Sequence, residues 1–304
     1  MQDMKKLVLM GLVALMSLMG GVNAQLLYKI SGNGLEKPSY IVGTYHLAPG
    51  TFADSIPGLK DAFASCKQIY GELDMQDALS DENRDKLEKA QLLPEGTTLS
   101  SLLTKEQMDR VNALMRETIG ADMTNPMLAA QFDKMTPTAL STTLTVFAFI
   151  KKSPNFNPMN LLDSHLQLLA QKQGMVIKGL ETVDFQVDVL YGGSLEKQVE
   201  ELMCVVDNFD DVVEMAEFVT AAYFSQDLDQ LLDVTNEESE GPCASSPESN
   251  DNLIYNRNAN WVKAMPDIMR QAPTFFAVGA AHLCGDKGVL RLLEQAGYKI
   301  EGVK

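Results

Sequence analysis

Basic residues and histidine are scarce in this chain. Of its 304 residues, 25 are lysine or arginine, 41 are acidic and only three are histidine, so the net charge is −16. Nucleic-acid binding needs a basic surface that neutralises phosphates, and this charge therefore excludes a general nucleic-acid binder. An anionic membrane surface is a poor partner for the same reason. Hydrophobic residues make up 45% of the chain, as in globular proteins, so we expect a buried core.

Long hydrophobic runs are also few. One run, from Leu7 to about Val22, follows the basic pair Lys5 and Lys6 and ends in small residues at the positions that a signal peptidase reads. We expect residues 1–24 to be a signal peptide cleaved after Ala24, and the protein to be exported to the periplasm or the extracellular space. The alternative is an uncleaved anchor. No second run of eighteen apolar residues follows, so we expect no stable membrane anchor after cleavage.

The chain has only four cysteines. In an oxidising compartment they can pair in three ways, and the spacing alone does not choose among them. We favour a disulfide between Cys204 and Cys243, because Cys243 lies in an acidic stretch, Glu237 to Asn252, rich in Ser, Pro and Asn, that needs a cross-link to be held in place. The alternative is that these cysteines are buried free thiols that pack as small hydrophobic side chains.

The pattern of apolar residues divides the rest of the chain into three regions. Residues 26–74 predict a hairpin that leads into a buried strand, followed by a helix and another strand. Residues from about 81 to 261 are mainly helical, with capping signals at Thr104, Asn125 and Thr136. In this region Asp163 is expected to cap a helix that runs to Gly174, and a short apolar strand follows at residues 175–180. Residues 274–304 predict strand, loop, helix and strand again.

The two ends of the chain carry the same short motif. Tyr40-Ile-Val-Gly-Thr-Tyr-His-Leu47 and Phe276-Ala-Val-Gly-Ala-Ala-His-Leu283 share an apolar strand end, Val, Gly, two variable residues and His-Leu. Glycine is only 21 of 304 residues, so its place three positions before two of three histidines has a chance probability on the order of 1 to 2%. Ligands bind at the carboxyl edge of open α/β sheets, where both histidines are expected. His46 and His282 therefore predict one shared site, although either alone would more often be structural.

A carboxylate follows the next predicted strand. Glu72 lies in Ile69-Tyr-Gly-Glu-Leu73, again directly after a glycine. Two imidazoles and one carboxylate form a ligand set suited to a divalent transition metal with positions left open for water. The alternative for Glu72 is an ordinary solvated carboxylate at the end of a strand.

The paired motifs Gly43-Thr-Tyr-His46 and Gly279-Ala-Ala-His282, with Glu72, resemble the TraB/GumN/PrgY family, to which the Tiki metalloproteases are related. The resemblance extends to Leu180-Glu181-Thr182 and to Arg257-Asn258. It implies an α/β fold with a central mixed sheet built from the N- and C-terminal β-Gly-x-x-His-α-β units. It also implies a single domain over residues 25–304, with a large helical insertion at about 81–261.

The resemblance implies a chemistry for the site. In Tiki-like members it implies peptide cleavage that depends on a divalent metal, with manganese or cobalt favoured and zinc as a further candidate, acting on a peptide or protein substrate. Carried onto this chain, His46, Glu72 and His282 are the expected metal ligands. Glu181 is expected to act as general base or as partner of a ligand, with an ordinary helix-start carboxylate as the alternative. Arg257 is expected to bind a substrate carboxylate or an oxyanion, with a structural ion pair as the alternative.

The sequence therefore favours an exported metal-dependent hydrolase that cleaves peptides. Two other classes remain open. One is a binding protein that sequesters a peptide or signal without cutting it. The other is an accessory factor for surface polysaccharide with a vestigial site.

Overall fold

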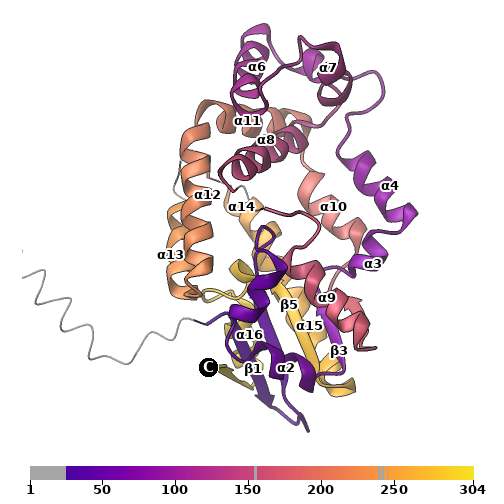
Figure 1. Cartoon of the computed structure of the whole chain (residues 1–304), viewed down its shortest axis with the longest axis vertical. Helices are drawn as coiled ribbons and strands as arrows, with labels where there is room; N and C mark the ends of the chain where they lie inside the picture. Colours follow the sequence, from indigo (N-terminus) through magenta and orange to yellow (C-terminus); the bar gives the residue numbers. More distant parts are fainter. Residues whose placement is uncertain (1–24, 154–155, 239–240, 242, 245) are drawn as a thin grey trace, which may run out of the picture.

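A six-stranded mixed sheet forms the base of the protein in the computed structural model, which describes residues 25–153, 156–238, 241, 243–244 and 246–304 (Figure 1). The strand order is β4-β3-β5-β2-β1-β6. β2, β3, β4 and β5 are parallel to one another, whereas β1 is antiparallel to both β2 and β6. The strands are β1 Leu27–Gly32, β2 Ser39–Thr44, β3 Gln68–Gly71, β4 Val176–Gly179, β5 Thr274–Gly279 and β6 Tyr298–Gly302.

The sheet confirms the expected α/β class and contains one strand, β4, that comes from neither end of the chain. Strands from both ends of the chain meet in the sheet, and β5 lies between β2 and β3. β4 comes from the middle region and extends the sheet beyond β3. β5 is buried along nearly its whole length, as expected for a central strand covered on both faces.

Helices pack on the sheet and bury one hydrophobic core with it. Trp261, Phe275 and Phe276 are among the largest side chains that this core encloses completely. The helices that contribute buried residues to it include α2 Leu59–Ser65, α9 Leu162–Lys172, α15 Asn256–Gln271 and α16 Val289–Gln295.

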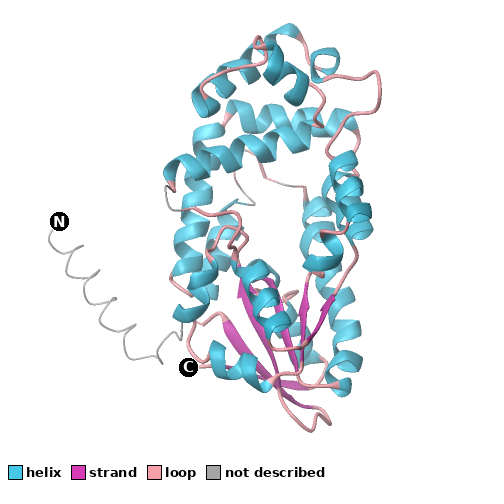
Figure 2. Ribbon diagram, turned by 45° about the vertical axis from the view of Figure 1, so that its right-hand side comes forward, coloured by secondary structure: helices cyan, strands magenta, loops and turns pink. Residues whose placement is uncertain are grey.

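The middle of the chain forms a large helical region on one side of the sheet (Figure 2). Part of it has a second hydrophobic core, around Met115, Leu140 and Leu202. Its helices are α3 Met75–Ala78, α4 Asp81–Ala90, α5 Leu99–Leu102, α6 Lys105–Ile119, α7 Pro126–Phe132, α8 Pro137–Lys152, α10 Val183–Tyr191, α11 Leu195–Asp207, α12 Phe209–Phe224, α13 Leu228–Glu238 and α14 Pro247–Asn250. A π-helical turn, η2 (Asp251–Tyr255), leads from α14 into α15.

Most of the predicted helix caps are confirmed. Thr104 and Gln107 form a capping box at the start of α6, and Gly120 ends that helix with a φ of 83°. Asn125 and Thr136 each accept a backbone hydrogen bond at a helix start that is followed by proline.

The predicted cap at Asp163 is wrong. α9 begins after Leu161, which makes no side-chain cap, and Asp163 lies inside the first helical turn. Its carboxylate instead accepts a hydrogen bond from Thr44 at the end of β2. A carboxylate in the first turn still interacts favourably with the helix dipole, so the helix tolerates this use of the side chain.

The predicted disulfide between Cys204 and Cys243 is confirmed, with the two Cα atoms 5.7 Å apart. It ties α11 to the segment that precedes η2. Cys66 and Cys284 are buried free thiols, and burial raises the pKa of each to about 12.

The predicted signal peptide, residues 1–24, lies outside the described residues. Among the helices that the structure describes, none combines the length and the apolar character needed to cross a bilayer.

Candidate functional site

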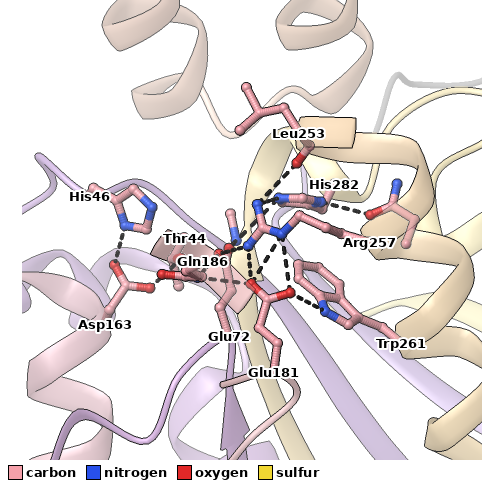
Figure 3. Close-up of polar contacts among 12 residues, drawn as sticks. Thr44, His46, Glu72, Asp163, Glu181, Gln186, Leu253, Arg257, Trp261 and His282 are labelled. Carbon is pink, nitrogen blue, oxygen red and sulfur yellow. Dashed lines mark hydrogen bonds and ion pairs between the residues drawn. The ribbon is translucent and has the colours of Figure 1, made fainter. Parts of the chain in front are cut away.

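The carboxyl ends of four neighbouring parallel strands each supply one predicted site residue. His46 follows β2, Glu72 follows β3, Glu181 follows β4 and His282 follows β5. Because these strands run in the same direction, the four side chains are presented along one edge of the sheet, although residues 46 and 282 are far apart in the sequence. Figure 3 shows three of them around Arg257, with His46 set to one side.

The two motif glycines let the strand ends pack closely. A Cβ atom on Gly43 would lie 2.9 Å from the Cβ atom of Ala280 in the second motif, closer than real contacts allow. A Cβ atom on Gly279 would lie 3.2 Å from Oε1 of Glu72, and the Gly279 N–H donates to that oxygen at 2.8 Å. Each glycine thus makes room for the other motif or for the carboxylate beside it.

The Arg257 guanidinium occupies the centre of the site. Its Nη2 donates to Oε2 of Glu72 at 2.6 Å and to Oε1 of Glu181, and its Nε donates to Oε1 of Glu181 at 3.0 Å. Its Nη1 donates to the Leu253 carbonyl at 3.0 Å and lies 3.2 Å from Nε2 of His282. These contacts engage all five N–H donors. They are the contacts expected if Arg257 forms a structural ion pair, which is the alternative given for this residue. Binding of substrate by Arg257 stays a prediction.

The two carboxylates beside Arg257 are almost fully buried. The exposed fraction of the side chain is 10% for Glu72 and 6% for Glu181. Burial by itself would raise the pKa of Glu72, but the charges of the neighbouring histidines and Arg257, with the Gly279 N–H, hold it below its ordinary value. Glu181 also accepts from Nε1 of Trp261 at 3.1 Å and from Nε2 of Gln186 at 2.9 Å. These contacts favour the partner role for Glu181 over that of general base.

His282 is held as a neutral ring with a defined tautomer. Its Nδ1 lies 2.7 Å from Oδ1 of Asn258, an oxygen that can only accept, so Nδ1 carries the proton. Burial lowers the pKa of His282 to about 4. The lone pair is therefore on Nε2, which lies 3.9 Å from Oε1 of Glu72.

His46 has the same arrangement at the other side of the site. Its Nδ1 lies 3.3 Å from Oδ2 of Asp163, and the other oxygen of Asp163 accepts from Thr44 at 2.6 Å. The hydrogen bond with Asp163 raises the pKa of His46 to about 9. The side chain is 72% exposed. Both predicted histidine ligands thus point Nδ1 at an oriented oxygen acceptor, which makes Nε2 the ligating atom, as in metal-binding histidines. In the present arrangement Nε2 of His282 contacts Nη1 of Arg257.

The donor chemistry fits a divalent transition metal, since two imidazole Nε2 atoms and a carboxylate are ligands that manganese, cobalt and zinc accept. The present side-chain positions bring together Glu72 and His282 but not His46, which turns toward Asp163 (Figure 3). Among the residues that the structure describes, no three His, Cys, Asp or Glu side chains are grouped closely enough to hold an ion.

Sequence reasoning missed two members of the site. The sequence predicts only a helix cap for Asp163 and no role for Thr44. Asp163 reaches both Thr44 and His46 because α9 brings it close to the end of β2, which no local pattern reveals. Asn258 was noted only beside Arg257. Arg257 and Asn258 are adjacent on α15, where successive side chains point about 100° apart, so that Arg257 reaches Glu72 and Asn258 reaches Nδ1 of His282.

A pocket of about 400 Å³ opens onto these groups. His46, Glu72, Arg257 and His282 form its polar end. The remaining wall is mostly apolar and comes from α10, α12, α13 and η2, so the helical region closes over the edge of the sheet.

Fold and site together define an α/β protein with a histidine and carboxylate centre at the carboxyl edge of its sheet. The profile of the TraB/PrgY/gumN family matches residues 26–302, and the chain belongs to this family.

Several curated relatives are metalloproteases. The chain is 24% identical to the Metalloprotease TIKI homolog of Nematostella vectensis, over 88% of this chain and 65% of that protein. It is 26% identical to Metalloprotease TIKI2 of Danio rerio, over 87% and 58%, and 24% identical to Metalloprotease TIKI1 of Homo sapiens, over 88% and 60%. The chain thus spans less than two thirds of the length of these relatives. No solved structure matches it at a significant level.

Proposed function

We propose that this protein is a metal-dependent hydrolase that cleaves peptides. The observation that carries the proposal is the arrangement of the two motif histidines. Each has Nδ1 fixed by an oxygen acceptor, which makes Nε2 the ligating atom, and both line one pocket with the buried carboxylate of Glu72. The TIKI relatives, which are named metalloproteases, support the same chemistry.

In this proposal His46, Glu72 and His282 hold the ion, with manganese or cobalt favoured and zinc as a further candidate. When bound, such an ion supplies Lewis-acid chemistry by polarising a carbonyl oxygen and acidifying water. Asp163 and Asn258 orient the two imidazoles. Glu181 acts as a positioning residue, because it holds Arg257, and Arg257 in turn holds Glu72.

The competing function is a binding protein that retains the site without turnover. It has one observation in its favour, which is that Arg257 now contacts both Glu72 and His282 and so engages two of the proposed ligands itself. In the hydrolase proposal this guanidinium must give up the contact with Nε2 of His282 when an ion binds.

A fluorogenic peptide library tests the proposal. Purified protein is incubated with the library in chelator and then with added Mn²⁺, Co²⁺ or Zn²⁺. We expect cleavage that needs a metal and that is lost in His46→Ala, which removes a proposed ligand. This variant should still fold, because the His46 side chain is exposed and its removal leaves the core intact. His165→Ala is the matched control, since His165 lies on α9 and does not line the pocket. Metal binding at the site without cleavage of any peptide would support the binding protein instead.

We also propose that the protein is exported, in keeping with the charged, apolar and small-residue order of residues 1–24. The disulfide between Cys204 and Cys243 supports an oxidising compartment. Mass spectrometry of the protein from its native host should find Gln25 at the N-terminus. An intact Met1 in the folded protein would contradict export with cleavage.

A further inference from the structure

The pocket at the site is divided into a polar end and an apolar wall. The polar end is the sheet edge with the proposed ligands, and the apolar wall comes from the helical region. Val189 and Leu190 reach the wall from α10, Val219 from α12, Leu231 from α13 and Ile254 from η2. A volume of about 400 Å³ lies in the range of pockets that enclose small ligands.

The pocket offers little to a charged side chain. Among the described residues that line it, the only groups with a charge are His46, Glu72 and Arg257, all at the polar end. All five donors of Arg257 are engaged, and both oxygens of Glu72 already accept hydrogen bonds. A lysine or an aspartate of a ligand would have to give up its water against the apolar wall, where the described lining residues carry no charged group to pair with it.

We propose that this wall is the specificity pocket of the enzyme and that it takes a large apolar side chain, such as that of Leu or Phe, next to the peptide bond that is cut. The inference rests on the proposed peptidase function and adds the substrate class to it. Burial of the three additional carbons of Leu relative to Ala predicts a preference of about 50-fold in kcat/KM.

Two pairs of substitutions test the pocket. Leu190→Asp and Val219→Asp place a carboxylate on the wall from two different helices. Phe185→Asp on α10 and Phe218→Asp on α12 are the matched controls, because both phenylalanines are exposed, by 36% and 51%, and neither lines the pocket. The substrates are peptides that the wild-type protein cleaves, remade with Leu, Phe, Ala, Lys or Asp at each position flanking the cut bond.

We expect wild-type protein to cut the Leu and Phe peptides best. The two wall variants should lose at least tenfold in kcat/KM on those peptides and should gain on the Lys peptide relative to wild type, while both controls keep the wild-type profile. Metal content, measured for all five proteins, should be equal. A profile indifferent to the flanking residue, or an equal loss in wall variants and controls, would overturn the inference and leave the peptidase proposal standing.

A binding measurement separates the two proposals. Saturation-transfer NMR with N-acetyl-leucine amide and N-acetyl-lysine amide reports on the pocket without any turnover. We expect transfer to the leucine amide only, and its loss in Val219→Asp but not in Phe218→Asp. If this pattern appears while no peptide is cleaved, the pocket assignment is supported and the peptidase function fails. If both amides or neither receive transfer, the apolar pocket assignment fails.

Discussion

Arg257 is the residue whose removal should reveal most about the site. Its guanidinium lies between Glu72 and Glu181, and the three side chains are 6%, 10% and 6% exposed. Replacement by Met keeps an unbranched apolar chain in place of the aliphatic part of Arg257 but leaves two buried carboxylates without their cation. Removal of one partner from a buried charge cluster costs about 3–5 kcal/mol. We therefore expect Arg257→Met to lower the free energy of unfolding by about that amount.

The assay is urea denaturation near neutral pH, followed by circular dichroism. Arg270→Met is the control, because Arg270 is on the same helix, is 62% exposed and pairs only with exposed Asp267 in the contacts described. It should change stability by less than about 0.5 kcal/mol. Lowering the pH to about 5 should reduce the deficit of Arg257→Met. A buried carboxylate without its cation has a raised folded-state pKa, so it stabilises the fold relatively more as the pH falls.

A double variant shows whether repulsion between the carboxylates is the cause. Glu181→Gln removes one charge and keeps an acceptor for Nε1 of Trp261, which now donates to Glu181. We expect Arg257→Met with Glu181→Gln to be more stable than Arg257→Met alone, by about 1–2 kcal/mol. The reasoning is refuted if Arg257→Met is no worse than Arg270→Met, or if the double variant loses the sum of the two single effects.

Three further predictions concern the histidines and the disulfide. His46→Ala and His282→Ala should each remove most of the bound divalent ion, and the double variant should bind scarcely less than either single variant, because ligands of one ion act as a unit. Plasma emission analysis measures the metal content, and additive losses of stability with unchanged metal content would mean two independent structural histidines. In metal-free protein, Asp163→Asn should move the pKa of His46 from about 9 toward 6.5, which NMR titration can follow; an unmoved titration would contradict the role of Asp163. The stabilisation that wild type gains from this pair should be present below about pH 6.5 and disappear as the pH rises through 9. Cys204→Ser should cost about 4 kcal/mol, since the disulfide closes a loop of 39 residues, and a reductant should shift the melting temperature of wild type but not of the variant.

The elements of the fold were predictable where the signal is local. The capping box at Thr104 and the glycine that ends α6 are both set by residues within one helix. The same holds for the hairpin of β1 and β2, whose turn residues separate two apolar runs. The repeated Gly-x-x-His motif placed both histidines correctly at the ends of strands, because strand end, glycine and histidine are adjacent in the sequence.

What the sequence could not provide is which elements lie beside each other. A short strand is expected at residues 175–180 and is found at Val176–Gly179, but its place at the edge of the sheet next to β3 depends on tertiary packing. The same packing brings Glu181 within reach of Arg257, 76 positions further along the chain. Asp163 failed as a cap because a partner 119 positions away, Thr44, competes for its carboxylate, and no helix propensity contains that information.

The position of β5 in the sheet has a consequence for synthesis of the protein. β2 and β3 are made early but do not pair with each other, because β5 lies between them and is translated roughly 200 residues after β3. A ribosome-bound chain that stops before β5 therefore presents two strands with open edges, which are prone to aggregate or to bind chaperones. His46, Glu72 and Arg257 all precede β5 in the chain, but His282 follows it, so the surroundings of Glu72 are complete only after β5 and His282 have been translated. A nascent or terminated chain that lacks β5 thus has no assembled site.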